Sequence, residues 1–432
     1  MPITPKSLNT RPNGELELGG IPICELAKEY GTPLYLMDEA TLRHHCHDYT
    51  DTLNRVYPNH MVVFAGKANL NLALLNLFAQ EGLGVDVVSG GELYTALKSH
   101  VSREKILFHG NNKSIKELTL AIASHIRIVV DNTQELARIV TITQELNQKA
   151  KILIRIKPEI EAHTHDYIKT GHIDSKFGID KNDLLSVIRT LVGNPLIHFA
   201  GIHSHIGSQI FDIQPFEDLA VLMAHHMNDI KDKLGITIEE LNLGGGIGIQ
   251  YIASDDPPSI AHYLEKMATK LKQECEKYAL PLPLLIVEPG RSMVGRAGMT
   301  VYNIGTVKEI PGIKDYVFID GGMADNPRPM MYQSQYTFTL ANKATKPHTH
   351  PYSIAGKYCE SGDILANGIL LPHAEVGDLL TVYGTGAYNY SMASHYNRSP
   401  LPAMVLVGTH SSRLMVKRET YEELSRYDIA TA

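Results

Sequence analysis

Short apolar runs alternate with segments of helical spacing along the first two thirds of the chain. Between about Leu34 and Gly290, eight runs have the length and composition of buried strands. These runs are Met61–Phe64, Gly84–Val88, Ile106–Phe108, Ile126–Val130, Lys151–Ile156, Phe199–His205, Glu240–Leu243 and Leu284–Val287. Apolar residues three and four positions apart predict helices between most of them, as in Leu70–Gln80, Gln134–Leu146 and Ile260–Tyr278. The alternation predicts an α/β fold, either a (β/α)8 TIM-like barrel or a doubly wound open sheet.

The residues that follow these runs favour the barrel. In a (β/α)8 barrel the active site lies at the carboxyl ends of the strands. Residues of functional types, or glycine turns, stand at nearly all of these ends: Lys67, Ser89, His109, Asn111, Asp131, Arg155, His205, Ser208, Gly244, Gly245, Gly246, Glu288 and Arg291. An arbitrary open sheet gives less reason for so many strands to end in this way.

The pattern changes after Arg291. Strand-like runs separated by glycine, proline and asparagine turns dominate there, and helical spacing returns only at Glu419–Ser425. The runs are Met299–Glu309, Asp315–Ile319, Gln335–Leu340, Leu379–Tyr383, Met404–Val407 and Arg413–Arg418. The first 33 residues also have the pattern of β structure and turns. We therefore predict an N-terminal segment, residues 1–33, that packs with a mostly β C-terminal domain, residues 296–432, and a barrel over residues 34–295.

Composition narrows the class of protein. The net charge of -7, with no Lys/Arg cluster beyond a local triplet, argues against a nucleic-acid partner. No apolar run approaches the ~18 residues of a membrane span, and the N-terminus lacks the apolar stretch of a secretory signal. The 4 cysteines lie far apart without a CxxC pair, as expected for reduced thiols. We expect a cytoplasmic protein with no membrane partner.

Two motifs offer an amine and an acid at strand ends. Lys67 stands in FAGKAN, Phe64–Asn69. Most strand-end lysines are surface charges, but a partly desolvated amine has a depressed pKa and forms imines with aldehydes. VEPGR offers Glu288 and Arg291 to one site. A carboxylate bonded to a pyridine nitrogen keeps that nitrogen protonated and makes the ring an electron sink; a structural salt bridge is the alternative.

Other motifs add groups that suit a phosphate and an aromatic ring. The glycine turn Leu243–Gly248 lets backbone N–H groups approach a phosphate, but it matches neither nucleotide-binding fingerprint. HSHIGSQ, His203–Gln209, has two histidines on one face of a strand, and no HExxH or CxxC set accompanies them, so we expect no metal. Gly384–Tyr388 ends a flexible turn in a tyrosine. In CESGD, Cys359–Asp363, a thiol precedes acidic groups and can serve as a proton donor.

Together these motifs resemble the alanine-racemase-like, fold type III pyridoxal-phosphate decarboxylases. The resemblance runs in order over nearly the whole chain. It includes FAGKAN at Phe64, GVDVVSGGEL at Gly84, TGHIDSKFGI at Thr170, HSHIGSQI at His203, LGGGIG at Leu243, EPGR at Glu288, RPMMY at Arg328, CESGD at Cys359 and GAYNYSMASHYN at Gly386. It implies a barrel of alanine-racemase type and a pyridoxal 5'-phosphate bound to Lys67 as a Schiff base.

The resemblance also implies the other site residues. It implies that Glu288 binds the pyridine nitrogen, that His205 stacks on the face of the ring and that Cys359 donates a proton. The cofactor-binding set is Lys67, His205, Ser208, Gly245, Gly246, Glu288, Arg291 and Tyr388. The substrate-binding set is Arg291, Arg328, Tyr332, Glu360 and Tyr388. In the family the CESGD cysteine and acid come from the neighbouring subunit, which implies a homodimer with shared active sites.

The motifs favour one branch of this family. Glu360 after the cysteine resembles the diaminopimelate enzymes, whereas the ornithine enzymes usually have Asp there, and two arginines suit a substrate with a distal carboxylate. This implies decarboxylation of meso-2,6-diaminopimelate to L-lysine and CO2, the last step of lysine biosynthesis. The alternatives are a decarboxylase of a D-amino acid, of carboxynorspermidine or of a carrier-linked glutamyl group, and a non-catalytic cofactor-binding relative. The chain departs from the family pattern at Gln333–Tyr336, where a histidine is frequent, and at Gly356–Tyr358.

Overall fold

The computed structural model describes residues 3–158, 160 and 176–430. Residues 170–175, the first part of the TGHIDSKFGI motif, lie outside the described residues. The chain forms two compact units. The barrel unit comprises His45–Gly248 and Asp256–Ser292, and the sheet unit comprises Met1–His44, Ile249–Asp255 and Met293–Ala432. The domain boundaries given above stay predictions.

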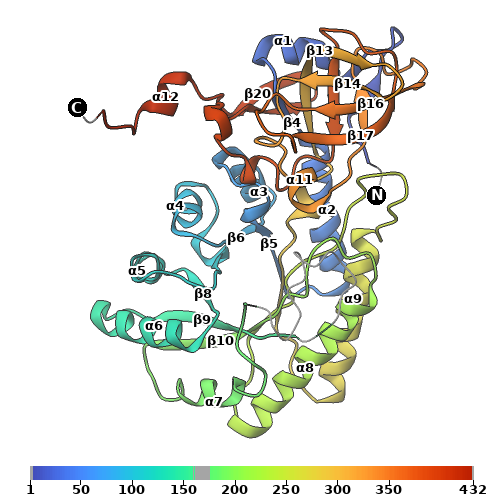
Figure 1. Ribbon diagram of the computed structural model, residues 1–432. Coiled ribbons are helices and arrows are strands. Elements are labelled where there is room, and N and C mark those ends of the chain that lie inside the picture. Colours follow the sequence, from blue (N-terminus) through green and yellow to red (C-terminus); the bar gives the residue numbers. More distant parts are fainter. Residues whose placement is uncertain (1–2, 159, 161–175, 431–432) are drawn as a thin grey trace. The chain divides into compact units, whose positions relative to one another are not determined.

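Eight parallel strands close into a barrel in the barrel unit (Figure 1). The strands are β5 (His60–Ala65), β6 (Gly84–Val87), β7 (Ile106–Phe108), β8 (Arg127–Val130), β9 (Ala150–Arg155), β10 (Ile197–His203), β11 (Glu240–Asn242) and β12 (Leu284–Val287). Closure comes from β12 pairing in parallel with β5, with Leu285 opposite His60. The predicted barrel is therefore confirmed, and the open sheet is excluded.

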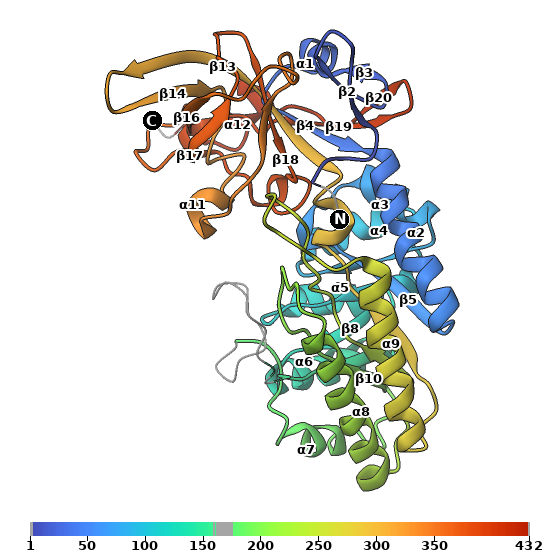
Figure 2. The same cartoon turned by 90° about the vertical axis from the view of Figure 1, so that its right-hand side faces the viewer.

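Helices follow the strands and lie on the outside of the barrel (Figures 1 and 2). They are α2 (Glu39–Val56), α3 (Leu72–Gln80), α4 (Gly90–Lys98), α5 (Ile115–Ala123), α6 (Thr133–Leu146), α7 (Leu184–Arg189), α8 (Gln214–Leu234) and α9 (Ile260–Lys277). The short helix α10 (Arg291–Val294) follows β12. Polar caps begin several of them soon after a strand ends: the side chains of Asn71, Ser89, Ser114 and Asn132 each accept the backbone N–H three residues on. Short loops of this kind hold the strand ends in place.

The sheet unit is built around a nine-stranded sheet. Its strands are β4 (Leu34–Asp38), β13 (Gly298–Ile310), β14 (Lys314–Ile319), β15 (Phe338–Leu340), β16 (His350–Ala355), β17 (Ile364–Leu371), β18 (Leu379–Tyr383), β19 (Ala403–Gly408) and β20 (Ser411–Val416). The long strand β13 pairs with β4, β14 and β18 and so joins the two ends of the sheet. Two short helices, α11 (Arg328–Tyr332) and α12 (Tyr421–Ser425), complete the C-terminal part.

The N-terminal segment differs in part from its prediction as β structure and turns. Strands β1 (Leu8–Thr10), β2 (Leu16–Leu18) and β3 (Ile21–Pro22) form a small sheet, but Ile23–Tyr30 is the helix α1. Ile23, Leu26 and Ala27 are spaced for one helical face, and they are its buried residues. That face packs in an apolar core with Leu18 and Leu36, and the β prediction for this helix was wrong.

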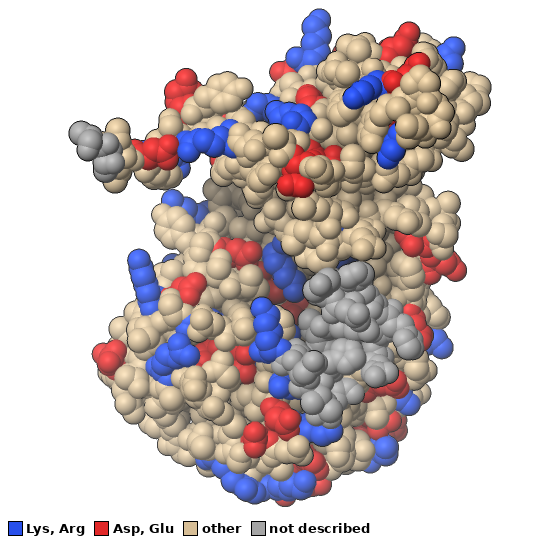
Figure 3. Space-filling view, viewed as in Figure 1, with Lys and Arg blue, Asp and Glu red and all other residues tan. Residues whose placement is uncertain are grey.

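Acidic and basic side chains are interspersed on the face of the molecule drawn in Figure 3. Among the described helices, none has both the length and the apolar character that crossing a membrane requires. No disulfide joins the four cysteines, all of which lie in the described part of the chain.

Candidate active site

Lys67 lies in a single 3-10 turn, Gly66–Ala68, directly after strand β5. Its side chain is exposed, whereas Gly66, Ala68 and Asn69 around it are buried. Glycine is required before it, because a Cβ on Gly66 would lie 2.8 Å from the carbonyl oxygen of Asp86. Packing therefore fixes the backbone of the turn and leaves the lysine amine at the mouth of the barrel.

Glu288 follows strand β12 and is the centre of a buried polar network. Its Oε1 lies 2.6 Å from Nε2 of His109 and accepts a hydrogen bond from Nδ2 of Asn242 at 2.6 Å. Nε2 of His203 lies 3.4 Å from Oε2. These partners come from the ends of β7, β11 and β10, so the barrel topology brings together four residues that are distant in sequence.

The network keeps the Glu288 carboxyl ionised. Burial opposes its charge, but His109 and His203 outweigh burial and hold the pKa of Glu288 well below its usual value. Burial lowers the pKa of His203 to about 3, and the Glu288 carboxylate opposes this shift without cancelling it. Burial raises the pKa of the neighbouring Asp86 to about 6. A buried carboxylate that stays ionised has the chemistry needed to hold a protonated pyridine nitrogen.

His205 lies beyond the end of β10, since the strand stops at His203. The expectation that both histidines share one face of a strand was therefore wrong; the chain turns toward the glycine loop instead. Burial lowers the pKa of His205 well below its usual value, and the positive charge of Lys67 adds to this effect. A neutral imidazole next to Lys67 suits stacking on an aromatic ring.

The glycine turn after β11 packs against two neighbouring loops. The backbone N–H of Gly245 donates to Nδ1 of His205 at 3.3 Å. A Cβ on Gly245 would lie 2.2 Å from the carbonyl oxygen of Glu288, so a larger residue would displace the Glu288 loop. Gly246 has φ +124, a conformation that side chains disfavour. The glycines thus allow three loops to pack closely together, in addition to allowing the backbone to approach a ligand.

Ser208 and Arg291 form a second polar pair at the same end of the barrel. Nε and Nη2 of the buried Arg291 donate to Oγ of Ser208 at 3.3 and 3.2 Å. A guanidinium and a hydroxyl held together in this way have the chemistry of an anion site, and a phosphate fits them. The Lys67 amine, the ionised Glu288, a neutral His205 and this pair therefore fit pyridoxal phosphate.

Several residues of this network received no role in the sequence analysis. His109 and Arg155 stood out only as strand-end residues, and His203 only as half of a histidine pair. Asn242 and Asp86 were missed, although a buried acid inside the apolar run GVDVV and an amide before a glycine turn were usable signals. His109, His203 and Glu288 place possible metal-ligand atoms within 4.8 Å of one another, so the absence of a metal stays a prediction.

Arg328 begins helix α11 in the sheet unit and is buried. Its Nη1 donates to the hydroxyl of Tyr336 at 2.7 Å, and its guanidinium carbon lies 5.0 Å from the centre of the Tyr251 ring. Tyr332, at the other end of the helix, is partly exposed. Tyr388 has φ 61, a left-handed conformation that is rare for tyrosine and typical of constrained functional positions.

The CESGD turn of the sheet unit presents the exposed side chains of Cys359, Glu360 and Ser361. Its last residue, Asp363, is buried and accepts hydrogen bonds from the backbone N–H of Met323 at 2.7 Å and of Tyr358 at 2.9 Å. The N–H of Cys359 donates to Oδ1 of Asn397 at 2.9 Å. This anchoring holds the turn while Cys359 and Glu360 remain exposed.

Comparison with known proteins shows the family of the chain. Residues 39–295 match the family described as pyridoxal-dependent decarboxylase, pyridoxal binding domain. A diaminopimelate decarboxylase of Synechocystis sp. is 47% identical over 425 residues, covering 96% of this chain and 90% of the relative. One from Bacillus subtilis is 44% identical and covers 96% of both chains.

Solved structures agree over the same length. The crystal structure of diaminopimelate decarboxylase from M. jannaschii in complex with L-lysine superposes with a TM-score of 0.91 at 36% identity, covering 99% of this chain and 98% of the other. The expected barrel fold and cofactor family are thus confirmed. The chain belongs to the diaminopimelate decarboxylases, within the pyridoxal-dependent decarboxylase family.

Proposed function

We propose that the protein decarboxylates meso-2,6-diaminopimelate to L-lysine and CO2 with pyridoxal phosphate as its cofactor. The observation that carries the proposal is the ionised, buried Glu288 at the mouth of the same barrel that exposes the Lys67 amine. The relatives named diaminopimelate decarboxylase match almost the full length of the chain, which supports the same substrate.

In this proposal the barrel unit holds the cofactor. Lys67 carries it through the amine, Glu288 holds a proton at the ring nitrogen, and His205 covers the ring. The phosphate is held by Ser208, Gly245, Gly246 and Arg291 of the barrel unit and by Tyr388. When bound, pyridoxal phosphate supplies an electron sink that stabilises the negative charge left at Cα when CO2 departs. The thiol of Cys359 then donates its proton to that carbon.

The sheet unit supplies substrate recognition. Among the described residues, no carboxylate forms an ion pair with Arg328, and a buried unpaired guanidinium favours an anionic ligand. We assign to Arg328 the distal carboxylate of the substrate and to the exposed Glu360 its distal ammonium group. Tyr332 and Tyr388 of the sheet unit and Arg291 of the barrel unit complete the proposed set of substrate contacts.

We also propose a homodimer with shared active sites. Cys359 and Glu360 are exposed on an anchored turn, as expected for groups that serve a second copy of the chain. Mixing the inactive variants Lys67→Ala and Cys359→Ala after partial denaturation should restore about a quarter of the wild-type activity, because half of the random dimers contain one intact site. No restored activity would contradict shared sites. The four cysteines without disulfides support a cytoplasmic location.

The proposed reaction is tested by incubating the cofactor-loaded protein with meso-diaminopimelate and identifying the product by mass. Release of CO2 with formation of L-lysine is the expected result. Parallel incubations with D-amino acids, carboxynorspermidine and a carrier-linked glutamyl substrate test the alternative decarboxylases. Cofactor binding without CO2 release from any of them would favour a non-catalytic relative.

A further inference from the structure

The surroundings of Arg328 consist of tyrosines and amides. Nη1 of Arg328 donates to the Tyr336 hydroxyl at 2.7 Å, and the guanidinium carbon lies 5.0 Å from the ring centre of Tyr251 and 5.7 Å from that of Tyr336. These distances fall in the range of cation–π contacts. In the part of the chain that the structure describes, no acid forms an ion pair with Arg328.

The two tyrosines are themselves held in fixed positions. Their rings meet edge to face, with centres 5.3 Å apart and planes at 86°. The Tyr336 hydroxyl donates to Oδ1 of Asn389 at 3.4 Å, and Nδ2 of Asn389 donates to Oδ1 of Asn326 at 2.6 Å. All of these side chains are buried. The hydroxyl of Tyr336 is therefore oriented by Asn389 so that it accepts from Arg328.

This arrangement stabilises the charge of Arg328 without cancelling it. The hydroxyl oxygen of Tyr336 and the ring faces of Tyr251 and Tyr336 direct partial negative charge toward the guanidinium. A carboxylate partner would neutralise the guanidinium and compete with an anionic ligand. A tyrosine ring and a hydroxyl oxygen instead leave the remaining N–H groups of the planar fork for a carboxylate.

We propose that Tyr251 and Tyr336 are positioning residues that fix the Arg328 guanidinium and thereby set the preference for substrates with a distal carboxylate. The inference rests on the role of Arg328 in the proposed function. Tyr336 lies in the Gln333–Tyr336 segment, where the chain departs from the family pattern. The unusual residue in this segment, Tyr336, thus has a specific contact, because its hydroxyl accepts a hydrogen bond from Arg328.

The inference is tested by binding two matched ligands to the cofactor-loaded protein. L-lysine has the distal carboxylate, and cadaverine is the same diamine without it. The wild type should bind L-lysine at least about tenfold more tightly than cadaverine, since a carboxylate–guanidinium pair adds this much. Tyr336→Phe removes one hydrogen bond to a charged group, so the Kd of L-lysine should rise about tenfold while that of cadaverine stays within about twofold.

Turnover and control variants separate positioning from a general structural role. In Tyr336→Phe, KM for meso-diaminopimelate should rise with little change in kcat. Tyr251→Leu should weaken L-lysine binding severalfold, and Tyr251→Phe, which keeps the ring, should restore it. Tyr352→Phe is the matched control, because the hydroxyl of this buried tyrosine of the same unit accepts a hydrogen bond from the backbone N–H of Ala374 and lies away from Arg328. It should leave the ratio of the two Kd values unchanged.

Equal weakening of both ligands in Tyr336→Phe, or no change in either, would overturn the positioning role. If Tyr336→Phe does not fold, the comparison of Tyr251→Leu with Tyr251→Phe gives the same decision. A wild type that turns over meso-diaminopimelate but binds both ligands equally would overturn the assignment of Arg328. A wild type without turnover would instead contradict the proposed function itself.

Discussion

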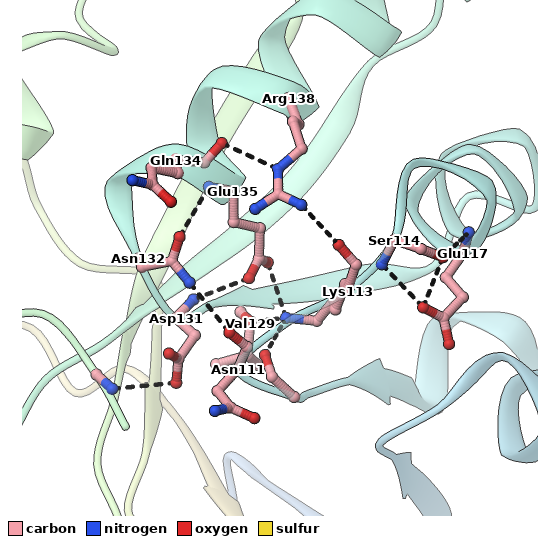
Figure 4. Close-up of polar contacts among 12 residues, drawn as sticks. Asn111, Lys113, Ser114, Glu117, Val129, Asp131, Asn132, Gln134, Glu135 and Arg138 are labelled. Atoms are coloured by element: carbon pink, nitrogen blue, oxygen red, sulfur yellow. Dashed lines mark hydrogen bonds and ion pairs between the residues drawn. The ribbon is translucent and has the colours of Figure 1, made fainter. Parts of the chain in front are cut away.

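Two lysines follow strands at the mouth of the barrel, and one is exposed to solvent whereas the other is buried. Lys67, after β5, has an exposed side chain. Lys113, after β7, is buried, and its amine donates to the carbonyl oxygens of Gly110 and Val129 at 2.7 and 2.8 Å and to Oε1 of Glu135 at 2.7 Å (Figure 4). Lys113 thus uses all three of its N–H donors within the protein.

The difference separates a chemical role from a structural one. Burial lowers the pKa of Lys113, and Glu135 opposes that shift without cancelling it. Its hydrogen bonds tie the loop after β7 to β8 and to helix α6, so its amine is held away from any aldehyde (Figure 4). Of these two lysines, Lys67 is the one that presents an accessible amine. Residue type and strand-end position alone do not distinguish the two lysines; the presence of a buried acid partner does.

The largest expected effect comes from removing the accessible amine. Lys67→Ala should lower activity to below ~0.1% of the wild type, because it removes the amine to which the cofactor is proposed to bind covalently. Its stability should change by less than about 0.5 kcal/mol, as for other exposed side chains. Borohydride reduction followed by peptide mass analysis should find the cofactor on Lys67 alone. Labelling of Lys113 in the wild type would contradict the comparison.

A large effect on stability is expected from the buried lysine. Lys113→Met leaves Glu135 buried without its partner and should reduce the free energy of unfolding of the barrel unit by about 3–5 kcal/mol. The double variant Lys113→Met/Glu135→Leu removes both charges and should recover most of this loss. Urea denaturation of the two variants measures the difference. Equal loss of stability in both would mean that packing, and not the unpaired charge, is responsible.

The sequence predicted which residues lie around Lys67 better than it predicted the hydrogen bonds that hold those residues in place. Apolar runs located the eight barrel strands to within about two residues, because strands buried on both faces have a strong pattern. Motif spacing singled out Lys67 and Glu288. It could not predict that His109 and Asn242 bond to Glu288, because barrel closure joins them across 179 and 46 positions.

The same limit applies to the sheet unit and to Lys113. Strands β16 and β17 were not predicted, since His350 and Pro351 begin the first and Asn367 and Gly368 interrupt the second. Lys113 lies in a loop and its partner Glu135 lies 22 residues away in helix α6, so spacing gives no sign of the pair. The contact between the Tyr251 ring and Arg328 joins residues more than 70 positions apart in the sequence. Such contacts depend on tertiary structure alone.

The smallest expected effect is a pH dependence that belongs only to the buried pair. Burial raises the pKa of Glu135 above its unfolded value, so the folded protein binds a proton here that the unfolded chain has released. The contribution to stability is therefore present below the unfolded pKa of about 4.5 and is lost as pH rises through the folded pKa. The measured quantity is the free energy of unfolding of the wild type minus that of Lys113→Met/Glu135→Leu. This difference should be about 1 kcal/mol larger at pH 4 than at pH 6.5.

Lys67 should have no part in this difference, because its side chain is exposed. The variant Lys67→Ala is therefore the control, and its stability should follow that of the wild type across the same pH range. The measurement is the free energy of unfolding in urea at each pH. A wild type that gains stability over the double variant between pH 4 and 6.5 would show that the Lys113–Glu135 attraction exceeds the cost of burying both charges. Lys113 would then be a net stabilising cation, and the contrast with Lys67 would lie in accessibility alone.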